Sequence, residues 1–480
     1  MNLTPIWPTA TQRNAQGELT FHGITATALL DQFGSPLYVI DTDEVRDRAH
    51  QFVTAAADAF HTTTTHVSFA AKAFLSKEIA RIVTSQGMFV DTCTMGEMQI
   101  ALAAGVSGRR LVLHGNNKSD AEIECAITNN FNKIVIDEPE EPARIAAIAK
   151  RLGKRARVML RVTSGIHAGG HEFVSTAHED QKFGVALLPV GANTDALDTA
   201  LDQAAESTGD TPDLLKALNG IADGPAIAVL QNIMKYSDVL ELVGVHSHIG
   251  SNIHDADAFI QAARRMMLLR KTFYAVSGYL LPEVDLGGGY SVAYTDSEDS
   301  MNIERELTRL ADAVTTANRN LGLPMPIISF EPGRWVVAPA GVTLYRVGTV
   351  KTVALAGDPA SRTYISVDGG MSDNIRPALY GSQYTAVLAN RNSEAEPRLS
   401  RVVGMHCESG DIVVNAVDLP SDVSRGDILA VPVTGAYGRT MASNYNQQLI
   451  PAVVAVSSQG AHVMLRRQTV DDLLALDVSQ

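Results

Sequence analysis

Lys72 stands in the apolar run VSFAAKAF (67–74), where a lysine must pair, react or extend its ammonium group to the surface. Loss of water lowers the pKa of an ammonium group, and a lysine that bonds to a carbonyl compound needs such a shift. The run is also typical of a surface lysine whose methylene groups lie along apolar neighbours. Lys72 is therefore a candidate nucleophile, with the surface role still open.

Two further segments combine glycine or histidine with a strand end. DLGGGY (285–290) has three consecutive glycines, which let backbone N–H groups approach a phosphate, although a tight turn has the same composition. HSHIGS (246–251) carries two histidines, but no third metal ligand stands at a suitable spacing, so no metal site is predicted. A flat imidazole can also pack against a planar ring, or simply lie in the core.

Carboxylates and guanidinium groups recur in the second half of the chain. In EPGRW (331–335), Glu331 could hold a protonated ring nitrogen and Arg334 could clamp an anion, unless the two form an ordinary salt bridge across the turn. In NIRPALYG (374–381), Arg376 and Tyr380 could converge on one carboxylate, or the segment could be a plain surface turn.

A thiol and a polar loop complete the candidates. CESGD (407–411) joins Cys407 to two carboxylates, although a buried structural cysteine is an alternative. GAYGRTMASNYN (435–446) is dense in Gly, Ser, Asn and Tyr, as in a ligand-facing loop or a solvent loop. The three cysteines lie far apart and are odd in number, so neither a disulfide framework nor a zinc site is indicated.

The elements that must position these groups alternate between short β-branched runs and amphipathic helical stretches. This α/β alternation suggests a (β/α)8 barrel, with a doubly wound sheet still possible from the pattern alone. Eight strands are predicted, at 65–71, 88–92, 110–114, 133–137, 157–162, 242–248, 283–287 and 327–331.

Reactive residue types stand at the ends of these predicted strands, where the catalytic groups of such barrels gather. They are Lys72, Asp91, His114, Arg161, His248, Gly287, Gly288, Gly289 and Glu331.

Three regions are expected. Residues 46–334 would form the barrel, interrupted at about 189–225 by a surface insertion rich in Asp, Ala and Gly. Residues 335–480 read as strands joined by turns and predict a β-rich C-terminal domain. Residues 1–45 include SPLYVID (35–41), a strand that could complete that domain.

The formal net charge of −14 on 480 residues argues against nucleic acid or anionic lipid as a partner. The N-terminus lacks the pattern of a signal peptide, and no apolar run has the length of a membrane span. A soluble protein of the cytoplasm, without membrane partners, is expected.

Taken together and in order, AAKAF, HGNNKS, HSHIGS, DLGGGY, EPGR, NIRPALYG, CESGD and GAYGRTMASNYN resemble the fold-type III decarboxylases that depend on pyridoxal 5'-phosphate (PLP). The resemblance runs from about residue 35 to the C-terminus and implies a PLP-binding barrel plus a β-domain. Phe69 and Phe74 depart from the family pattern, because a tyrosine and an asparagine are usual there.

The resemblance also implies roles. Lys72 would bond to PLP, His248 would stack on its ring, and Glu331 would pair with the ring nitrogen. Cys407 would return a proton to the substrate, from a loop that reaches the neighbouring subunit's site in a homodimer. The remaining implied contacts are Ser251, Gly287, Gly288, Gly289, Gly333 and Arg334 for the cofactor, Asp91 and Glu97 near it, Arg334, Arg376, Tyr380 and Glu408 for the substrate, and Tyr445 for both.

The substrate implied is meso-2,6-diaminopimelate, decarboxylated to L-lysine and CO2. Its second amino-carboxylate calls for groups of both signs, which Arg376 and Glu408 would supply. Alternatives are a decarboxylase for carboxynorspermidine, arginine or ornithine, a PLP-binding regulator without catalysis, and a lysine-dependent aldolase barrel without PLP.

Overall fold

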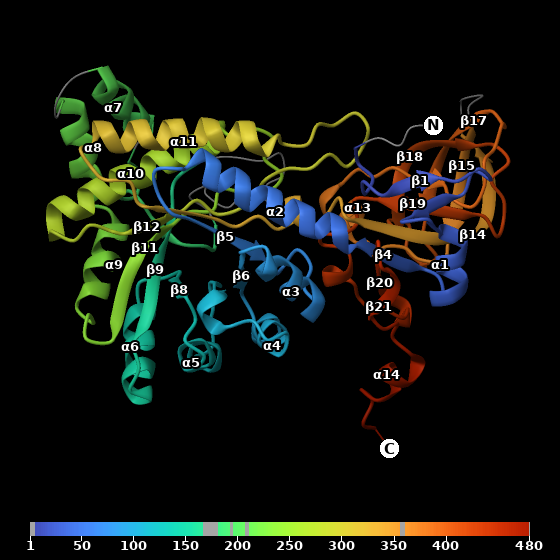
Figure 1. Cartoon of the computed structure of the whole chain (residues 1–480), viewed down its shortest axis with the longest axis horizontal. Coiled ribbons are helices and arrows are strands. Elements are labelled where there is room, and N and C mark those ends of the chain that lie inside the picture. Colours follow the sequence, from blue (N-terminus) through green and yellow to red (C-terminus); the bar gives the residue numbers. More distant parts are fainter. Residues whose placement is uncertain (1–4, 167–180, 193–194, 207–210, 356–360, 480) are drawn as a thin grey trace.

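The computed structural model describes residues 5–166, 181–192, 195–206, 211–355 and 361–479. Two bodies of secondary structure lie along the long axis in Figure 1, a ring of strands wrapped by helices and a twisted sheet. Helix α2 (Thr42–Ala59) runs from one towards the other. No helix among the described residues is long and apolar enough to cross a bilayer.

The first body is a closed barrel of eight parallel strands, which confirms the predicted fold and excludes the doubly wound sheet. Closure follows because the eight strands pair in sequence and β8 also pairs with β9. The strands are β5 (Thr65–Ala70), β6 (Phe89–Thr92), β7 (Leu111–Leu113), β8 (Lys133–Ile136), β9 (Ala156–Thr163), β11 (Leu240–His246), β12 (Glu283–Asp285) and β13 (Ile327–Phe330), with the short β10 (Val185–Ala186) beside β9.

Helices cover the outside of the barrel, and most begin at a side-chain cap. Ser76, Thr94 and Ser119 each accept a backbone N–H at the start of the helix that follows. The apolar faces of these helices pack on the strands, which also carry buried charged groups such as Lys133, Glu283 and Asp285. The helices are α3 (Lys77–Ser85), α4 (Met95–Ala103), α5 (Asp120–Thr128), α6 (Glu141–Leu152), α9 (Pro225–Met234), α10 (Asp257–Ser277) and α11 (Ile303–Asn320).

The insertion forms helices α7 (Asp195–Glu206) and α8 (Pro212–Ala222), and residues 193–194 and 207–210 of it lie outside the described part. These helices pack against α10, where the buried Arg265 pairs with Asp198 at 2.7 Å. The insertion is therefore attached to the outside of the barrel wall.

The second body is a mixed sheet in the order β18-β17-β15-β14-β4-β20-β21, with β19 paired to β14. The predicted N-terminal strand is at its centre, because β4 (Leu37–Asp41) pairs antiparallel with β14 and parallel with β20. The other strands are β14 (Gly341–Ala354), β15 (Ser361–Val367), β17 (Pro397–Val403), β18 (Ile412–Pro420), β19 (Ile428–Pro432), β20 (Ala452–Ser457) and β21 (Gly460–Leu465).

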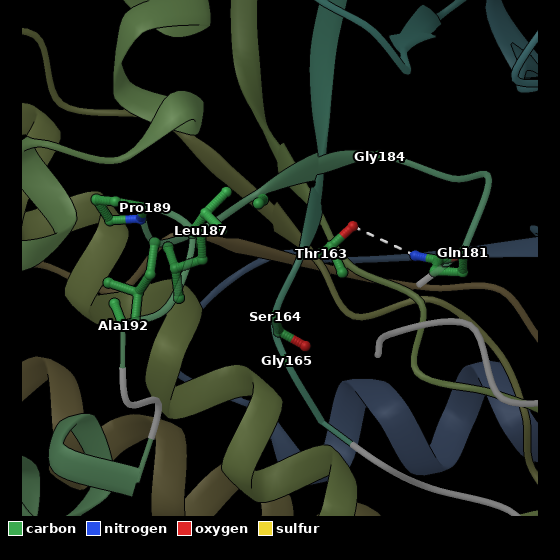
Figure 2. Close-up of a pocket in the computed structure, with 11 residues that line it drawn as sticks. Thr163, Ser164, Gly165, Gln181, Gly184, Leu187, Pro189 and Ala192 are labelled. Atoms are coloured by element: carbon green, nitrogen blue, oxygen red, sulfur yellow. Dashed lines mark hydrogen bonds between the residues drawn. The ribbon is translucent and has the colours of Figure 1, made fainter. Parts of the chain in front are cut away.

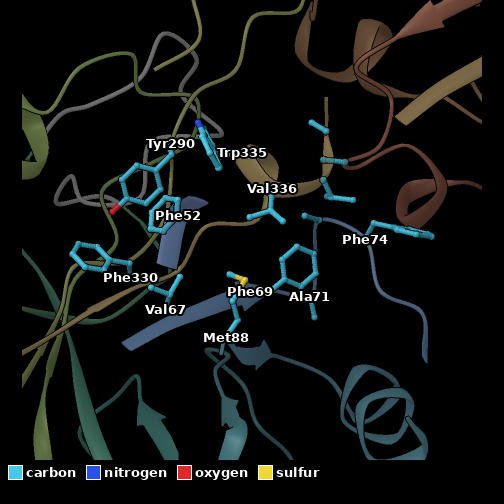
Figure 3. Close-up of a cluster of buried hydrophobic side chains, with 14 of the residues drawn as sticks. Phe52, Val67, Phe69, Ala71, Phe74, Met88, Tyr290, Phe330, Trp335 and Val336 are labelled. Carbon is cyan, nitrogen blue, oxygen red and sulfur yellow. The ribbon is translucent and has the colours of Figure 1, made fainter. Parts of the chain in front are cut away.

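A buried aromatic cluster joins α2 to the barrel wall and to α12 (Arg334–Val337), as Figure 3 shows. The ring of Phe52 meets Tyr290 edge-on at 5.0 Å and Trp335 at 5.6 Å between centroids. Phe69 lies in this apolar cluster with no exposed surface. The hydroxyl that the family pattern would place here therefore has no polar site to serve.

Candidate active site

The eight parallel strands bring their carboxyl ends to one face of the barrel, and the predicted residues gather there. A cavity of about 380 Å³ opens at this face. Its lining includes nine of the predicted residues: Lys72, His248, Ser251, Gly289, Glu331, Gly333, Arg334, Arg376 and Tyr380. Groups that follow β5, β11, β12 and β13 therefore meet residues of the second body in one pocket.

Lys72 follows β5 and extends into the cavity, where its surroundings are ionic. Loss of water lowers its pKa, but Tyr437 and the carboxylates of Asp91 and Glu331 outweigh that effect and raise it above the ordinary lysine value. The predicted lowering of this pKa is therefore wrong. The neighbours Ala71, Ala73 and Phe74 are buried in the core, while the ammonium group lies near the carboxylates of Asp91 and Glu331.

Glu331 lies at the floor of the cavity and is 5% exposed. Burial alone would raise its pKa, but His114 and His246 lie against the carboxylate and hold its pKa well below the usual range. His114 Nε2 is 2.8 Å from Oε1, and His246 Nε2 is 3.1 Å from Oε2. The site thus contains a buried, ionised carboxylate.

His248 also lines the cavity, and its Nδ1 accepts the backbone N–H of Gly250 at 3.2 Å. Loss of water, followed by the charges of Lys72 and Arg161, holds its pKa well below the ordinary value. A neutral, flat imidazole is consequently available to pack against a ring.

Two buried guanidinium groups face the cavity without a carboxylate. Arg334 donates to Ser251 Oγ at 2.8 Å and to the Tyr294 hydroxyl, and Arg376 donates to Tyr384 Oη at 3.0 Å. Within the described ranges, neither arginine has an acidic partner within ion-pair distance. Both are 7% exposed, so the arrangement favours an anionic ligand.

Tyr437 is a pocket residue that the sequence argument missed. Its ring lies 4.7 Å from the Arg334 guanidinium carbon and 5.6 Å from that of Arg376. Its N–H donates to Ala73 O at 2.8 Å, next to Lys72. GAYGRTMASNYN contains two tyrosines, and the prediction named only the second, so composition identified the loop but not the residue.

Cys407, Glu408 and Tyr445 lie apart from this cavity. All three are exposed, and none of them lines it. The Tyr445 ring lies 5.3 Å from His406, beside Cys407, whose N–H donates to Asn446 Oδ1 at 3.2 Å. These residues form a separate patch on the second body.

Asp91 and Glu97 occupy the far side of Lys72. Asp91 is 8% exposed, and burial raises its pKa to about 7. Glu97 accepts the Cys93 N–H at 2.7 Å at the start of α4. Glu97 therefore fixes the turn that follows Asp91, and it lines a neighbouring groove with Lys72.

A second cavity of about 290 Å³ lies between β9, β10 and the start of the insertion, as Figure 2 shows. Its lining is mostly apolar, with Leu187, Pro189 and Ala192 on one side and Thr163 and Gln181 on the other. It contains none of the predicted site residues and no ionisable group.

Comparison with known proteins identifies the family. Residues 43–206 and 220–338 match the model of the "pyridoxal-dependent decarboxylase, pyridoxal binding domain". A diaminopimelate decarboxylase of Mycobacterium tuberculosis is 42% identical over all of this chain and 99% of its own length, and one of Bacillus subtilis is 36% identical over 97% of each. This chain belongs to the diaminopimelate decarboxylase family.

Solved structures agree with that family. A diaminopimelate decarboxylase from M. jannaschii superposes with a TM-score of 0.81 over 98% of both chains at 26% identity, and another crystal of it contains L-lysine. The decarboxylase family binds PLP.

The glycine loop after β12 packs so closely against the neighbouring backbone that no side chain fits at its three glycines. Gly287 has φ +69°, and a Cβ there would come within 2.8 Å of Ser247 O. A Cβ on Gly288 would come within 2.2 Å of Glu331 O, and one on Gly289 within 2.5 Å of Gly250 O. With Ser251 and Arg334 adjacent, this cradle fits a phosphate at one end of the cavity, and Glu331 fits a ring nitrogen at its floor.

Proposed function

We propose that this protein decarboxylates meso-2,6-diaminopimelate to L-lysine and CO2 with PLP. The supporting observation is the pair of buried guanidinium groups, Arg334 and Arg376, that face the Lys72 cavity without an acidic partner among the described residues. A substrate with a second carboxylate at the end away from the reacting carbon can pair with these guanidinium groups, whereas a substrate with a simple amine at that end cannot.

The residues around the cofactor divide into a covalent anchor, a stacking group and two charged ends. Lys72 Nζ would supply the amine that binds PLP, and the imidazole of His248 would pack against its ring. Glu331 would hold the proton on the ring nitrogen. Bound PLP supplies an electron sink for the electron pair that departing CO2 leaves on the α-carbon. The phosphate contacts are Ser251, Gly287, Gly288 and Gly289. Gly333 and Arg334 also contact the cofactor, while Asp91 and Glu97 fix the surroundings of Lys72.

The distal end of the substrate requires both signs of charge. Arg334, Arg376 and Tyr380 bind the distal carboxylate, and Glu408 binds the distal ammonium group. Tyr445 contacts cofactor and substrate from the loop that carries it. This division explains how one cavity selects a molecule with an amino-carboxylate at each end.

Cys407 delivers the proton to the α-carbon, and it does so from a second subunit. The exposure of Cys407 and Glu408, and their absence from the Lys72 cavity of their own chain, support a homodimer with shared active sites. In this proposal residues 46–334 form the PLP-binding domain, residues 335–480 together with 1–45 form the β-domain, and the protein acts in the cytoplasm.

The test is to incubate the purified protein, loaded with PLP, with meso-diaminopimelate and to measure lysine and CO2. Equal amounts of the two products are expected, and ornithine, arginine and carboxynorspermidine should yield far less CO2. If one of those three compounds yields CO2 and diaminopimelate yields no lysine, that compound replaces diaminopimelate as the proposed substrate. A protein that retains no PLP would overturn the whole proposal.

A further inference from the structure

Glu331 is held from two sides by imidazoles that no proposed step uses. His114 follows β7 and His246 ends β11, and each reaches a different oxygen of the carboxylate. The His114 contact at 2.8 Å is an ion-pair contact, and the His246 contact at 3.1 Å is a hydrogen bond. The two rings meet edge-on at 5.0 Å. Two contacts from different strands fix both the position and the plane of the carboxylate.

The two histidines differ in charge. His114 Nε2 also lies 3.5 Å from Asp91 Oδ1, between two carboxylates. Burial lowers the pKa of His114, but Asp91 and Glu331 outweigh it and raise that pKa above the ordinary value. His246 has no exposed surface, and burial lowers its pKa. His114 is therefore the cation, and His246 is a neutral N–H donor.

No other cation replaces His114 at this carboxylate. Among the residues that the structure describes, no lysine or arginine lies within ion-pair distance of Glu331. The nearby Lys133 pairs instead with Glu283 at 2.5 Å and with Asp285 at 3.2 Å. A buried carboxylate without a cation takes up a proton, and a protonated carboxyl group cannot hold a proton on a ring nitrogen.

We infer that His114 and His246 are positioning residues that hold Glu331 ionised and aligned for the ring nitrogen of PLP, His114 through its charge and His246 through its N–H. This inference rests on the proposed function, because it concerns the same cofactor. It also gives His114 a second task, since His114 links the carboxylate near Lys72 to the carboxylate at the ring nitrogen.

The difference between the two histidines defines the test. His246→Gln keeps a neutral N–H donor, so its behaviour should stay close to that of the wild type, whereas His246→Leu removes the donor. His114→Gln keeps a donor but removes the charge. His50→Gln, an exposed change on α2, is the matched control. Each holoenzyme is prepared with PLP labelled with ¹⁵N in its ring, and the ¹⁵N chemical shift reports whether that nitrogen carries a proton.

The proposal predicts an order of effects. His114→Gln should lose ring protonation at a lower pH than the wild type and lower kcat at least about tenfold, with KM changed less than about threefold. His246→Gln should change ring protonation and kcat little, whereas His246→Leu should resemble His114→Gln in both. Other groups around the two histidines also titrate between about pH 6 and 9, so each variant is compared with the wild type at the same pH. The charged and titratable groups that face the pair and its carboxylate are Lys72, Asp91, Lys133, Arg161, His248, Asp285 and Glu331.

Three outcomes are decisive. If wild-type protein forms lysine and His114→Gln keeps the wild-type ¹⁵N shift across the pH range, this inference is wrong and the proposed function stands. If the wild type retains no PLP or forms no lysine, the proposed function itself fails. His114, His246 and Glu331 also lie close enough to bind a metal ion. Stoichiometric metal in elemental analysis of the active holoenzyme would therefore overturn the hydrogen-bonded role.

Discussion

Arg334 donates from Nη2 to Ser251 Oγ at 2.8 Å, which joins the turn after β13 to the loop after β11. The same guanidinium group contacts the Tyr294 hydroxyl and faces the ring of Tyr437. One arginine therefore ties the loop after β11 to the part of the cavity wall that the second body supplies. Under the proposed function, the cofactor end and the substrate end of the site share this one support.

Replacement of Lys72 by alanine should abolish the covalent attachment of PLP at this position and lower kcat roughly a thousandfold or more, because the amine that binds the cofactor in the proposed function is removed. Borohydride reduction followed by peptide mass spectrometry checks the attachment. Lys77→Ala, at the exposed start of α3, is the control and should label normally at Lys72. A label that moves to another lysine without loss of activity would contradict this assignment.

Arg376→Gln should raise the KM for diaminopimelate roughly 10- to 100-fold and change kcat less, because a charge-assisted contact to the distal carboxylate is lost. Lysine should inhibit this variant less, since lysine keeps that carboxylate. Arg376→Lys retains the charge, so its KM should lie between those of the wild type and Arg376→Gln. Steady-state kinetics measures these effects, with Arg425→Gln as an exposed control. An unchanged KM in Arg376→Gln would show that Arg376 does not bind the substrate.

A mixture of two inactive variants should regain activity if the sites are shared. Lys72→Ala and Cys407→Ala each remove one half of every site, but a mixed dimer contains one intact site. Random mixing of equal amounts should restore about a quarter of the wild-type activity. Dissociation, mixing and assay of the two proteins measure the recovery. Activity that stays at the level of the separate variants would place Cys407 in the site of its own chain.

Gly287→Ala should weaken PLP binding at least about tenfold, because the new Cβ meets Ser247 O. Gly278→Ala is a matched control, with φ +71° against +69° and no atom within 4 Å of the new Cβ. Both changes should cost about 1–2 kcal/mol of stability for the left-handed backbone. Only the first should reduce PLP affinity, measured by cofactor titration of the apoprotein. Equal losses in both variants would show that the effect is on folding alone.

Asp373 should make the folded state less stable as the pH rises from about 4 to about 7. Burial raises its pKa to about 7 from an ordinary value of 3.8, so the folded protein keeps a proton that the unfolded chain has released. Asp373→Asn cannot lose that proton, and its Tm relative to wild type should increase across this range by the equivalent of a few kcal/mol at most. Asp223→Asn, at the surface, is the control. A constant difference in Tm would contradict the assignment.

The barrel could be predicted because its strands and helices are encoded locally. Runs such as RVMLRV and KIVID are short and rich in apolar residues, and they alternate with amphipathic helical stretches, which is typical of an α/β fold. All eight predicted strands are present, and SPLYVID joins the second sheet as expected. The small N-terminal sheet of Thr11–Arg13, Leu19–Phe21 and Ile24–Thr25 has strands too short for a pattern to indicate.

The site was less predictable where the outcome depends on orientation. His246 and His248 stand two residues apart in one motif, yet His246 reaches Glu331 below while His248 lines the cavity. Tyr437 and Tyr445 share one loop, and only Tyr437 faces the cavity of its own chain. The pKa of Lys72 depends on carboxylates that are distant in sequence. Side-chain direction and long-range charge are properties of the assembled barrel.

The central position of β4 in the second sheet has a consequence for synthesis on the ribosome. β4 is made before any barrel strand, but its partner β14 begins about 300 residues later and β20 later still. The nascent chain can therefore complete the barrel while β4 has neither neighbour. Pairing of β4 with β20 must wait until Arg376 and Tyr437 have emerged, so the segments of the second body that line the cavity are also among the last to become ordered.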